Sequence, residues 1–326
     1  MKRGYSIDIW RPSANPQLLL KRAQLLAFLR DFFAQREVME VDTPTLARAS
    51  VTDTNIHSIA ASANGDSCYL QTSPEYFMKR MLASGIGDIY YLGKVFRDGE
   101  QGSRHNPEFT LLEWYRVGWD EHQLMAEIEA LIGLLLQQLD RPELAVSRIS
   151  YCDCFIEAFN IDPHHCALAE LQELAVNLGY PSWCNESRAN CLDLLFSEKI
   201  EPKLPDGLVF VYDYPACQAA LAQTKLYGDG ALVSRRFEVF LNRMELANGY
   251  FELTDAAEQR QRFEEDLMAR AAAQRSQVPL DNNLHQAMQA GLPSCAGVAL
   301  GVDRLLMQLY GIKSIDRVLA FGWERC

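Results

Sequence analysis

Phe96-Arg97-Asp98-Gly99-Glu100, followed after a short loop by Arg104-His105-Asn106-Pro107-Glu108-Phe109, is the stretch that decides the fold. On either side, residues 88–97 and 108–117 are rich in Tyr, Val, Phe and Leu, a composition typical of strands. The polar segment 98–107 contains glycine and favours a loop. The sequence therefore predicts a long hairpin whose tip carries arginine, histidine and an aromatic ring, groups that bind phosphate and stack on a purine.

Helical and strand patterns surround this hairpin. Apolar residues recur at helical spacing in 16–36 and again in 124–139, and a charged helix is expected over 255–274. Residues 38–44 alternate and end in Pro44, which fits a strand closed at a sheet edge. At Ser73-Pro74-Glu75, the serine is expected to cap a helix that begins with the proline.

The remaining pattern predicts an α+β fold. Strand character returns at 208–212 and 237–241, whereas residues 142–205 are polar, have short periodicities and are interpreted as an insertion. Separated strands with hairpin connections and flanking helices indicate a largely antiparallel sheet. We expect one catalytic-type domain over residues 1–326 that contains this insertion.

Composition limits the classes of function. The 326 residues are 48% hydrophobic, so the chain can bury a large core, and its net charge of -12 repels a nucleic-acid backbone. Residues 1–8 lack an apolar signal-peptide core, and no stretch approaches the ~18 apolar residues of a membrane span. These features predict a cytoplasmic protein with neither a membrane nor a tRNA partner.

The nine cysteines form an odd count at irregular spacing, which favours reduced thiols over a disulfide framework. Cys152-Asp153-Cys154 and His164-His165-Cys166 contain residue types that bind zinc. They lack the usual Cys-x-x-Cys and His spacings, so we interpret these cysteines as structural.

A second chemical pattern places two carboxylates in neighbouring strands. If Asn242-Arg243 is a two-residue turn, Phe240 opposes Glu245, and Glu238, Phe240 and Glu245 share one face of the sheet. Such carboxylates need a cation when buried, and magnesium is a suitable one. The alternative is a pair of glutamates on a solvent-facing sheet surface.

A third pattern is Gly297-Val298-Ala299-Leu300-Gly301-Val302-Asp303-Arg304-Leu305, apolar residues and glycines that lead into a helix. Glycine at 301 lets a ligand approach the backbone, and Arg304 near the start of the helix can face a phosphate. A strand-to-helix turn of this kind is weak support when taken alone.

In this order the stretches resemble the three motifs of class II aminoacyl-tRNA synthetases: Pro44 for the first, Arg97 to Glu113 for the second and Gly301 to Arg304 for the third. The likeness is greatest to the lysyl-tRNA synthetase catalytic domain, through the run Thr72-Ser73-Pro74-Glu75 and the run from Glu245 to Leu253. It covers the chain from about residue 16 onward and implies the class II synthetase catalytic fold, with ATP and Mg²⁺ as cofactors.

The resemblance also implies roles for single residues. Arg97 would hold the α-phosphate, His105 and Arg304 the outer phosphates, and Phe109 the adenine. The full ATP-binding set would be Arg97, Asp98, Gly99, Glu100, His105, Asn106, Phe109, Glu245, Leu246, Gly301 and Arg304, with Arg97 and Arg304 catalytic and Glu238 and Glu245 holding magnesium. The amino-acid pocket would comprise Ser73, Pro74, Glu75, Glu113, Tyr115, Asn248, Tyr250, Glu252 and Ala299, and its acids suit a substrate with two ammonium groups.

Two departures from the family bear on specificity. The family usually has Arg-x-Glu where this chain has Arg97-Asp98-Gly99-Glu100, so the glutamate is either lost or supplied one residue later by Glu100. Ala299 stands where lysyl-tRNA synthetases usually have glycine, and one methyl on a pocket wall discriminates by ~1–3 kcal/mol between close substrates. We therefore do not expect ordinary L-α-lysine to be the preferred substrate.

Only residues 1–15 precede the region of resemblance, where lysyl-tRNA synthetases carry an anticodon-binding β-barrel. This shortened form resembles the elongation factor P (R)-β-lysine ligase family, in which lysine or β-lysine is activated as an adenylate with ATP and joined to a lysine of elongation factor P. That likeness implies a homodimer formed by the leading helix and the strand ending at Pro44. Two alternatives remain: a free-standing core that lysylates tRNA or forms a small amide, and a non-catalytic adenylate-binding regulatory paralogue.

Overall fold

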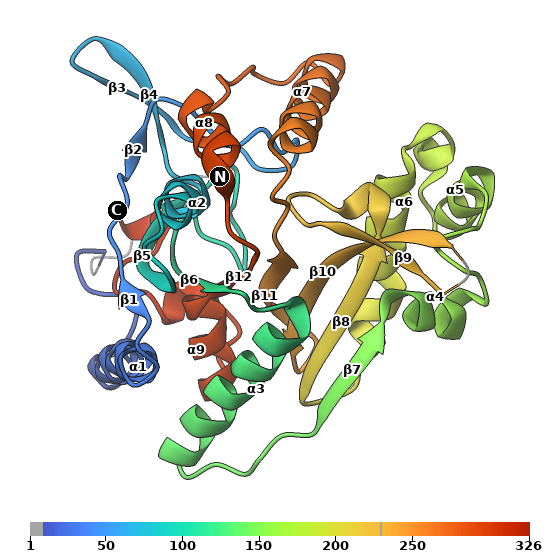
Figure 1. Ribbon diagram of the computed structural model, residues 1–326. Coiled ribbons are helices and arrows are strands. Elements are labelled where there is room, and N and C mark those ends of the chain that lie inside the picture. The colour runs from blue at the N-terminus through green and yellow to red at the C-terminus, as the bar shows by residue number, and fades with distance from the viewer. Residues whose placement is uncertain (1–8, 229) are drawn as a thin grey trace. The chain divides into compact units, whose positions relative to one another are not determined.

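A computed structural model describes residues 9–228 and 230–326, and it divides into two compact units (Figure 1). The first unit contains the residues up to Tyr115, Asp255–Pro293 and Ala299–Cys326, and the second contains Arg116–Thr254 and Ser294–Val298. Strands β6 and β12 each begin in one unit and end in the other. The segment 1–8, on which the expectation about targeting rests, lies outside the described residues.

The first unit is built around the hairpin of β5 and β6. These strands pair antiparallel from Ile89 opposite Tyr115 to Phe96 opposite Glu108, which confirms the predicted hairpin. A small second sheet has the strand order β2-β4-β3. The elements of this unit are α1 (Pro16–Ala34), β1 (Met39–Glu40), β2 (Leu46–Ala47), β3 (Ala60–Ala63), β4 (Asp66–Leu70), α2 (Glu75–Ala83), β5 (Ile89–Phe96), β6 (Glu108–Val117), α7 (Ala256–Ala272), α8 (Asn282–Gly291), β12 (Cys295–Gly301) and α9 (Val302–Tyr310).

Helix α1 forms where the apolar stripe predicts it. The Asn15 side chain accepts a hydrogen bond from the backbone N–H of Leu18, and Pro16 opens the helix. The strand expected over 38–44 is shorter than predicted, because only Met39–Glu40 pairs with β5, in parallel. The helix predicted at Ser73 also begins later, at Glu75, whose backbone N–H donates to the Ser73 hydroxyl at 3.0 Å.

The second unit contains the antiparallel strands that carry Glu238 and Glu245. β10 pairs antiparallel with β8, β9 and β11, and β7 pairs parallel with β8. Asn242 and Arg243 both have positive φ, as a two-residue hairpin turn of type I′ requires. The elements are α3 (Glu121–Gln138), β7 (Val146–Ser150), α4 (Tyr151–Phe159), α5 (Leu168–Asn177), α6 (Arg188–Leu195), β8 (Leu208–Pro215), β9 (Thr224–Tyr227), β10 (Ala231–Leu241) and β11 (Met244–Phe251).

The stretch interpreted as an insertion supplies helices α4, α5 and α6 of this unit (Figure 1). Their apolar side chains form a core with the neighbouring strands, in which Tyr151 stacks on Phe155 and Phe196, and Phe240 of β10 joins Phe196. Mixed helices and mainly antiparallel strands confirm the predicted α+β class.

Two further observations concern the described residues as a whole. Within residues 9–228 and 230–326, the helices are all too short or too polar to cross a membrane. All nine cysteines are present as thiols, and five of them are buried: Cys68, Cys152, Cys154, Cys191 and Cys295.

Candidate active site

The β5–β6 hairpin brings Arg97 together with an aromatic ring and a carboxylate. The Arg97 guanidinium lies 5.1 Å from the centre of the Phe109 ring and 3.3 Å from the Glu100 carboxylate. Its Nε also donates to the backbone carbonyl of Thr72 at 3.3 Å. A fixed guanidinium beside a half-exposed ring is an arrangement that can bind the phosphate and base of a nucleotide.

Glu100 is the acid that accompanies Arg97 in this loop. Gly99 adopts φ +77°, a conformation that residues with a side chain rarely adopt, and the next residue turns its carboxylate back to Arg97. Asp98 is held by a hydrogen bond from its N–H to the carbonyl of His57 at 2.7 Å. Glu100 is thus the acid that contacts Arg97 in this loop, and whether it replaces the glutamate expected one residue earlier stays a prediction.

Arg304 and His105, the predicted partners of the outer phosphates, lie side by side. An Arg304 terminal nitrogen is 2.8 Å from Nε2 of His105, and Arg304 Nε donates to the carbonyl of Arg104. The two residues are far apart in the sequence, on α9 and on the hairpin loop. This proximity places two groups that bind anions at one position of the first unit.

Asp303 is a positioning residue that the sequence analysis missed. One of its carboxylate oxygens pairs with Arg22 of α1 at 2.5 Å, and the other accepts the backbone N–H of Thr110 at 2.7 Å. Its side chain is 2% exposed. Asp303 thus fixes the start of α9, and with it Arg304, to the strand that carries Phe109. The sequence pattern that could have identified Asp303 is an acidic residue in the first turn of a helix, where the helix begins directly after a glycine.

The Asn106 side chain makes its hydrogen bonds within the protein. Its amide nitrogen donates to the carbonyl of Glu108 at 2.6 Å, and its amide oxygen accepts the N–H of Trp323 at 3.0 Å. The side chain is 5% exposed. Both ends of the amide are engaged within the chain, so this residue holds the C-terminal segment against the hairpin loop.

A buried hydrogen-bond network joins three of the residues predicted for the amino-acid pocket, all in the first unit. The Glu113 carboxylate accepts hydrogen bonds from the Ser73 and Tyr115 hydroxyls, both at 2.8 Å. Glu113 and Tyr115 are 2% exposed. Two hydroxyl donors hold the carboxylate in one orientation.

Glu75 lies in the first turn of α2, after Pro74, which adopts a helical conformation at the cap. Its carboxylate pairs with Lys79 one turn later at 2.7 Å, and Lys79 is 1% exposed. The sequence analysis did not identify Lys79, although a Glu–Lys pair four residues apart on a helix is a readable pattern. The Lys79 ammonium group therefore balances the negative charge that Glu75 was expected to contribute to the pocket.

Ala299 and Gly301 lie on the same face of β12, because alternate residues of a strand point the same way. Both are only partly buried, whereas Leu300 between them is fully buried. A ligand on this face would contact the Ala299 methyl group and the Gly301 backbone together. The influence of Ala299 on which substrate is accepted stays a prediction.

In the second unit, Arg236 connects three of the predicted site residues. Its guanidinium pairs with Glu238 at 2.6 Å and donates to the Asn248 side-chain oxygen at 3.1 Å, and the Asn248 amide donates to the Tyr250 hydroxyl at 2.6 Å. The register places Glu238 opposite Asn248, and Arg236 opposite Tyr250. Cross-strand pairing explains this cluster, and the sequence analysis had not included Arg236.

The hairpin register agrees with the predicted pairing of Phe240 with Glu245. Burial raises the pKa of Glu238 to about 7, and the charge of Glu245 contributes to this rise while Arg236 opposes it. An acid whose charge raises the pKa of Glu238 is a near neighbour of that residue. They form a pair that an additional cation would stabilise.

Two other predicted residues of this unit are buried. Leu246 of β11 is 2% exposed. It lies at the irregularity where the β10–β11 register shifts, which is opposite Val239 and Phe240 of β10. Glu252 is 1% exposed, and its N–H donates to the carbonyl of Cys295 at 3.0 Å. The roles expected for Leu246, Glu252 and the rest of the set in ligand binding stay predictions.

Comparison with known proteins agrees with this geometry. The model of the family described as tRNA synthetases class II (D, K and N) matches residues 3–325. A protein of Vibrio cholerae named elongation factor P--(R)-beta-lysine ligase is 44% identical, covering 97% of this chain and 98% of its own length. Proteins of the same name from Pseudoalteromonas translucida and Edwardsiella ictaluri are 46% and 45% identical and cover 98% and 97% of this chain, and 99% and 98% of their own lengths. The chain belongs to the family of class II tRNA synthetases (D, K and N).

Proposed function

We propose that this chain activates (R)-β-lysine with ATP and transfers it to a lysine side chain of elongation factor P. The observation that carries the proposal is the full-length identity of 44–46% to proteins named for this reaction. The arrangement of Arg97, Phe109, Glu113 and Ala299 in the first unit supports it. Membership of the family makes the chain an ATP-dependent ligase.

In the first step the substrate carboxylate attacks the α-phosphorus of ATP, a bond to that phosphorus breaks, and pyrophosphate leaves. Arg97 stabilises the charge that develops on the phosphoryl oxygens, and His105 and Arg304 bind the departing phosphates. Positioning of the two reactants supplies about 7–11 kcal/mol of the barrier reduction. The neutral amine of the acceptor lysine then attacks the adenylate carbonyl and AMP leaves.

The amino-acid substrate is recognised by charge. Glu113, held by Ser73 and Tyr115, binds an ammonium group, and Glu75 binds a second one in competition with Lys79. The Ala299 methyl group narrows the pocket wall, which favours one isomer over another. This set of contacts fits a diamine such as lysine or β-lysine.

Glu238 and Glu245 are the residues that we propose for magnesium. The raised pKa of Glu238 indicates an acid whose charge lacks full compensation, and carboxylate oxygens are the ligands that Mg²⁺ prefers. When bound, the ion supplies positive charge for phosphate chemistry. Arg236 already pairs with Glu238, so the chain itself provides part of that compensation when no ion is bound.

We also propose that the protein works as a cytoplasmic homodimer through α1 and β1. Large apolar side chains are exposed on these elements, with Leu20 61% and Met39 48% exposed. Exposed apolar side chains on adjoining segments are typical of a surface that another chain covers. Sedimentation is expected to give twice the mass of one chain, and a stable monomer at micromolar concentration would contradict this proposal.

The test of the reaction is ATP–pyrophosphate exchange with α-lysine and both β-lysine enantiomers, followed by transfer to purified elongation factor P. We expect the fastest exchange with (R)-β-lysine and a mass gain on the acceptor. Arg97→Ala should lower the exchange rate about 10²–10³-fold. Arg48→Ala is the control, because its ion pair with Asp66 lies at the surface, with the Arg48 side chain 85% exposed.

Three outcomes would overturn the proposal. Exchange with no lysine isomer would leave a binding protein rather than a ligase. Faster exchange with L-α-lysine would contradict the proposed role of Ala299 in selecting the substrate. Transfer to tRNA in place of elongation factor P would show that the acceptor is wrong.

A further inference from the structure

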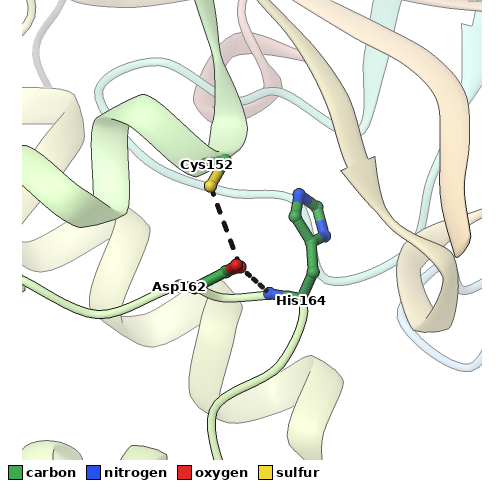
Figure 2. A group of neighbouring side chains, drawn as sticks. All are labelled: Cys152, Asp162 and His164. Carbon is green, nitrogen blue, oxygen red and sulfur yellow. Dashed lines mark hydrogen bonds between the residues drawn. The ribbon is translucent and has the colours of Figure 1, made fainter. Parts of the chain in front are cut away.

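A group of metal-ligand side chains lies in the second unit and includes none of the residues assigned to the candidate active site (Figure 2). Cys152 is in the first turn of α4, and Asp162 and His164 are in the loop that follows this helix. A sulfur of Cys152, a carboxylate oxygen of Asp162 and a ring nitrogen of His164 lie within 4.8 Å of one another. Thiolate, carboxylate and imidazole are the three side-chain groups that bind zinc in proteins.

We propose that Cys152, Asp162 and His164 bind one divalent transition-metal ion, with zinc as the expected occupant and the fourth position open to water. The Cys152 sulfur is 3.7 Å from Oδ1 of Asp162. With metal–ligand bonds of about 2.3 Å to sulfur and about 2.1 Å to oxygen, a tetrahedral site has a sulfur–oxygen edge of about 3.5 Å. Two of the three ligands are therefore already at the spacing of a metal site.

The loop around Asp162 is fixed without any ion. Oδ1 of Asp162 accepts the backbone N–H of His164 at 2.8 Å, and Oδ2 lies 2.9 Å from Nδ1 of His165. Arg188 of α6 donates to the carbonyls of Pro163 and Cys166 at 2.6 and 2.8 Å. His165 thus orients the carboxylate from the side away from Cys152, as outer-shell partners of metal ligands do.

His164 is the observation that a purely structural reading leaves unexplained. Both of its ring nitrogens are buried, and neither has a hydrogen-bond partner among the described residues. Buried polar atoms nearly always have one. A ring nitrogen of His164 is among the atoms that lie within 4.8 Å of one another, and imidazole nitrogen is a common metal ligand.

The cysteine spacing gave no hint of this site, because Cys154 is not part of it. Asp162 lies in the loop just beyond the C-terminal end of α4, where Asn160 in the left-handed conformation reverses the direction of the chain. Binding releases the thiol proton of Cys152 to solvent. The ion would connect the first turn of α4 to the loop after it, which is a structural role within the insertion.

The test is direct metal binding by the full-length protein without ATP. After dialysis against a chelator, Co²⁺ is titrated as a spectroscopic probe for zinc, and bound metal is counted by mass spectrometry. We expect one ion per chain, a thiolate-to-cobalt charge-transfer band, and displacement of cobalt by one equivalent of Zn²⁺. Cys152→Ser should abolish the band, and Asp162→Asn and His165→Ala should each weaken binding about 10–100-fold.

Cys184→Ser is the matched control, since Cys184 is an exposed thiol of the same unit and should leave binding unchanged. Circular dichroism and melting of each apo variant show whether it folds, and Asp162→Asn keeps the side-chain shape if Cys152→Ser does not fold. An unchanged band in Cys152→Ser, unchanged affinity in folded Asp162→Asn, or no stoichiometric metal in the wild-type protein would overturn the proposal.

Discussion

Replacing Asp303 by alanine tests whether this buried carboxylate holds the start of α9 in place. The change removes the carboxylate that pairs with Arg22, whose side chain is 13% exposed and also donates to the Thr110 hydroxyl, and it removes the acceptor for the backbone N–H of Thr110. Breaking a buried ion pair from one side costs about 3–5 kcal/mol. The unpaired N–H would add about 1–3 kcal/mol if it found no water. Because Arg22 can partly regain solvent, we expect a total loss of about 3–5 kcal/mol.

The assay is urea unfolding followed by tryptophan fluorescence and circular dichroism, with Arg48→Ala as the control. Arg48 pairs with Asp66 at the surface, where such a pair is worth under about 1 kcal/mol. A double-mutant cycle with Arg22→Ala should give a coupling of about 0.5–3 kcal/mol. The KM for ATP in the exchange reaction should also rise, since Arg304 follows Asp303. An Asp303→Ala variant no less stable than Arg48→Ala would refute this reasoning.

Three further changes give distinct outcomes. Tyr115→Phe removes one hydrogen bond to the buried Glu113 carboxylate, which should cost about 1.5–3 kcal/mol in urea unfolding and raise the KM for the amino acid. The pKa of Glu238 is about 7 in the folded protein and 4.5 in the unfolded chain, so the folded protein keeps this proton to higher pH. The free energy of unfolding should therefore fall by up to about 3 kcal/mol as the pH rises from 4.5 to 7. Urea unfolding of Glu238→Gln at several pH values should lack this component. Gly249→Ala places a methyl group against the Phe237 ring, closer than side chains normally pack, so we expect a lower melting temperature and a loss of about 1–3 kcal/mol; an unchanged melting temperature would contradict the close approach.

Features fixed by neighbouring residues could be predicted from the sequence. The strands on either side of the Arg97 loop and the Asn242-Arg243 turn depend on local composition and turn chemistry, and both form as expected. Helix α1 follows from its apolar spacing and its proline. Within the first unit Arg97 lies near Phe109 and Arg304 lies near His105, and the expectation that these residues surround one nucleotide stays a prediction.

Features that depend on distant partners could not be predicted. Asp303 meets Arg22 across nearly the whole length of the chain, and no local pattern encodes that pairing. Arg236 reaches Asn248 through a strand register that a bulge shifts, so the contact follows from the folded hairpin. Strand β1 is limited to Met39–Glu40 by its pairing with another strand, and the alternation of residues 38–44 does not reveal how far that pairing extends.

The buried contact between Glu75 and Lys79 has a consequence for how this protein can diverge. Replacing Glu75 alone removes an ion-pair partner of Lys79, whose side chain is 1% exposed, and breaking a buried ion pair from one side is costly. Relatives that acquire a new substrate preference through position 75 must therefore also change position 79. The two sites should covary across natural sequences, and a library that randomises only one of them should yield few folded members.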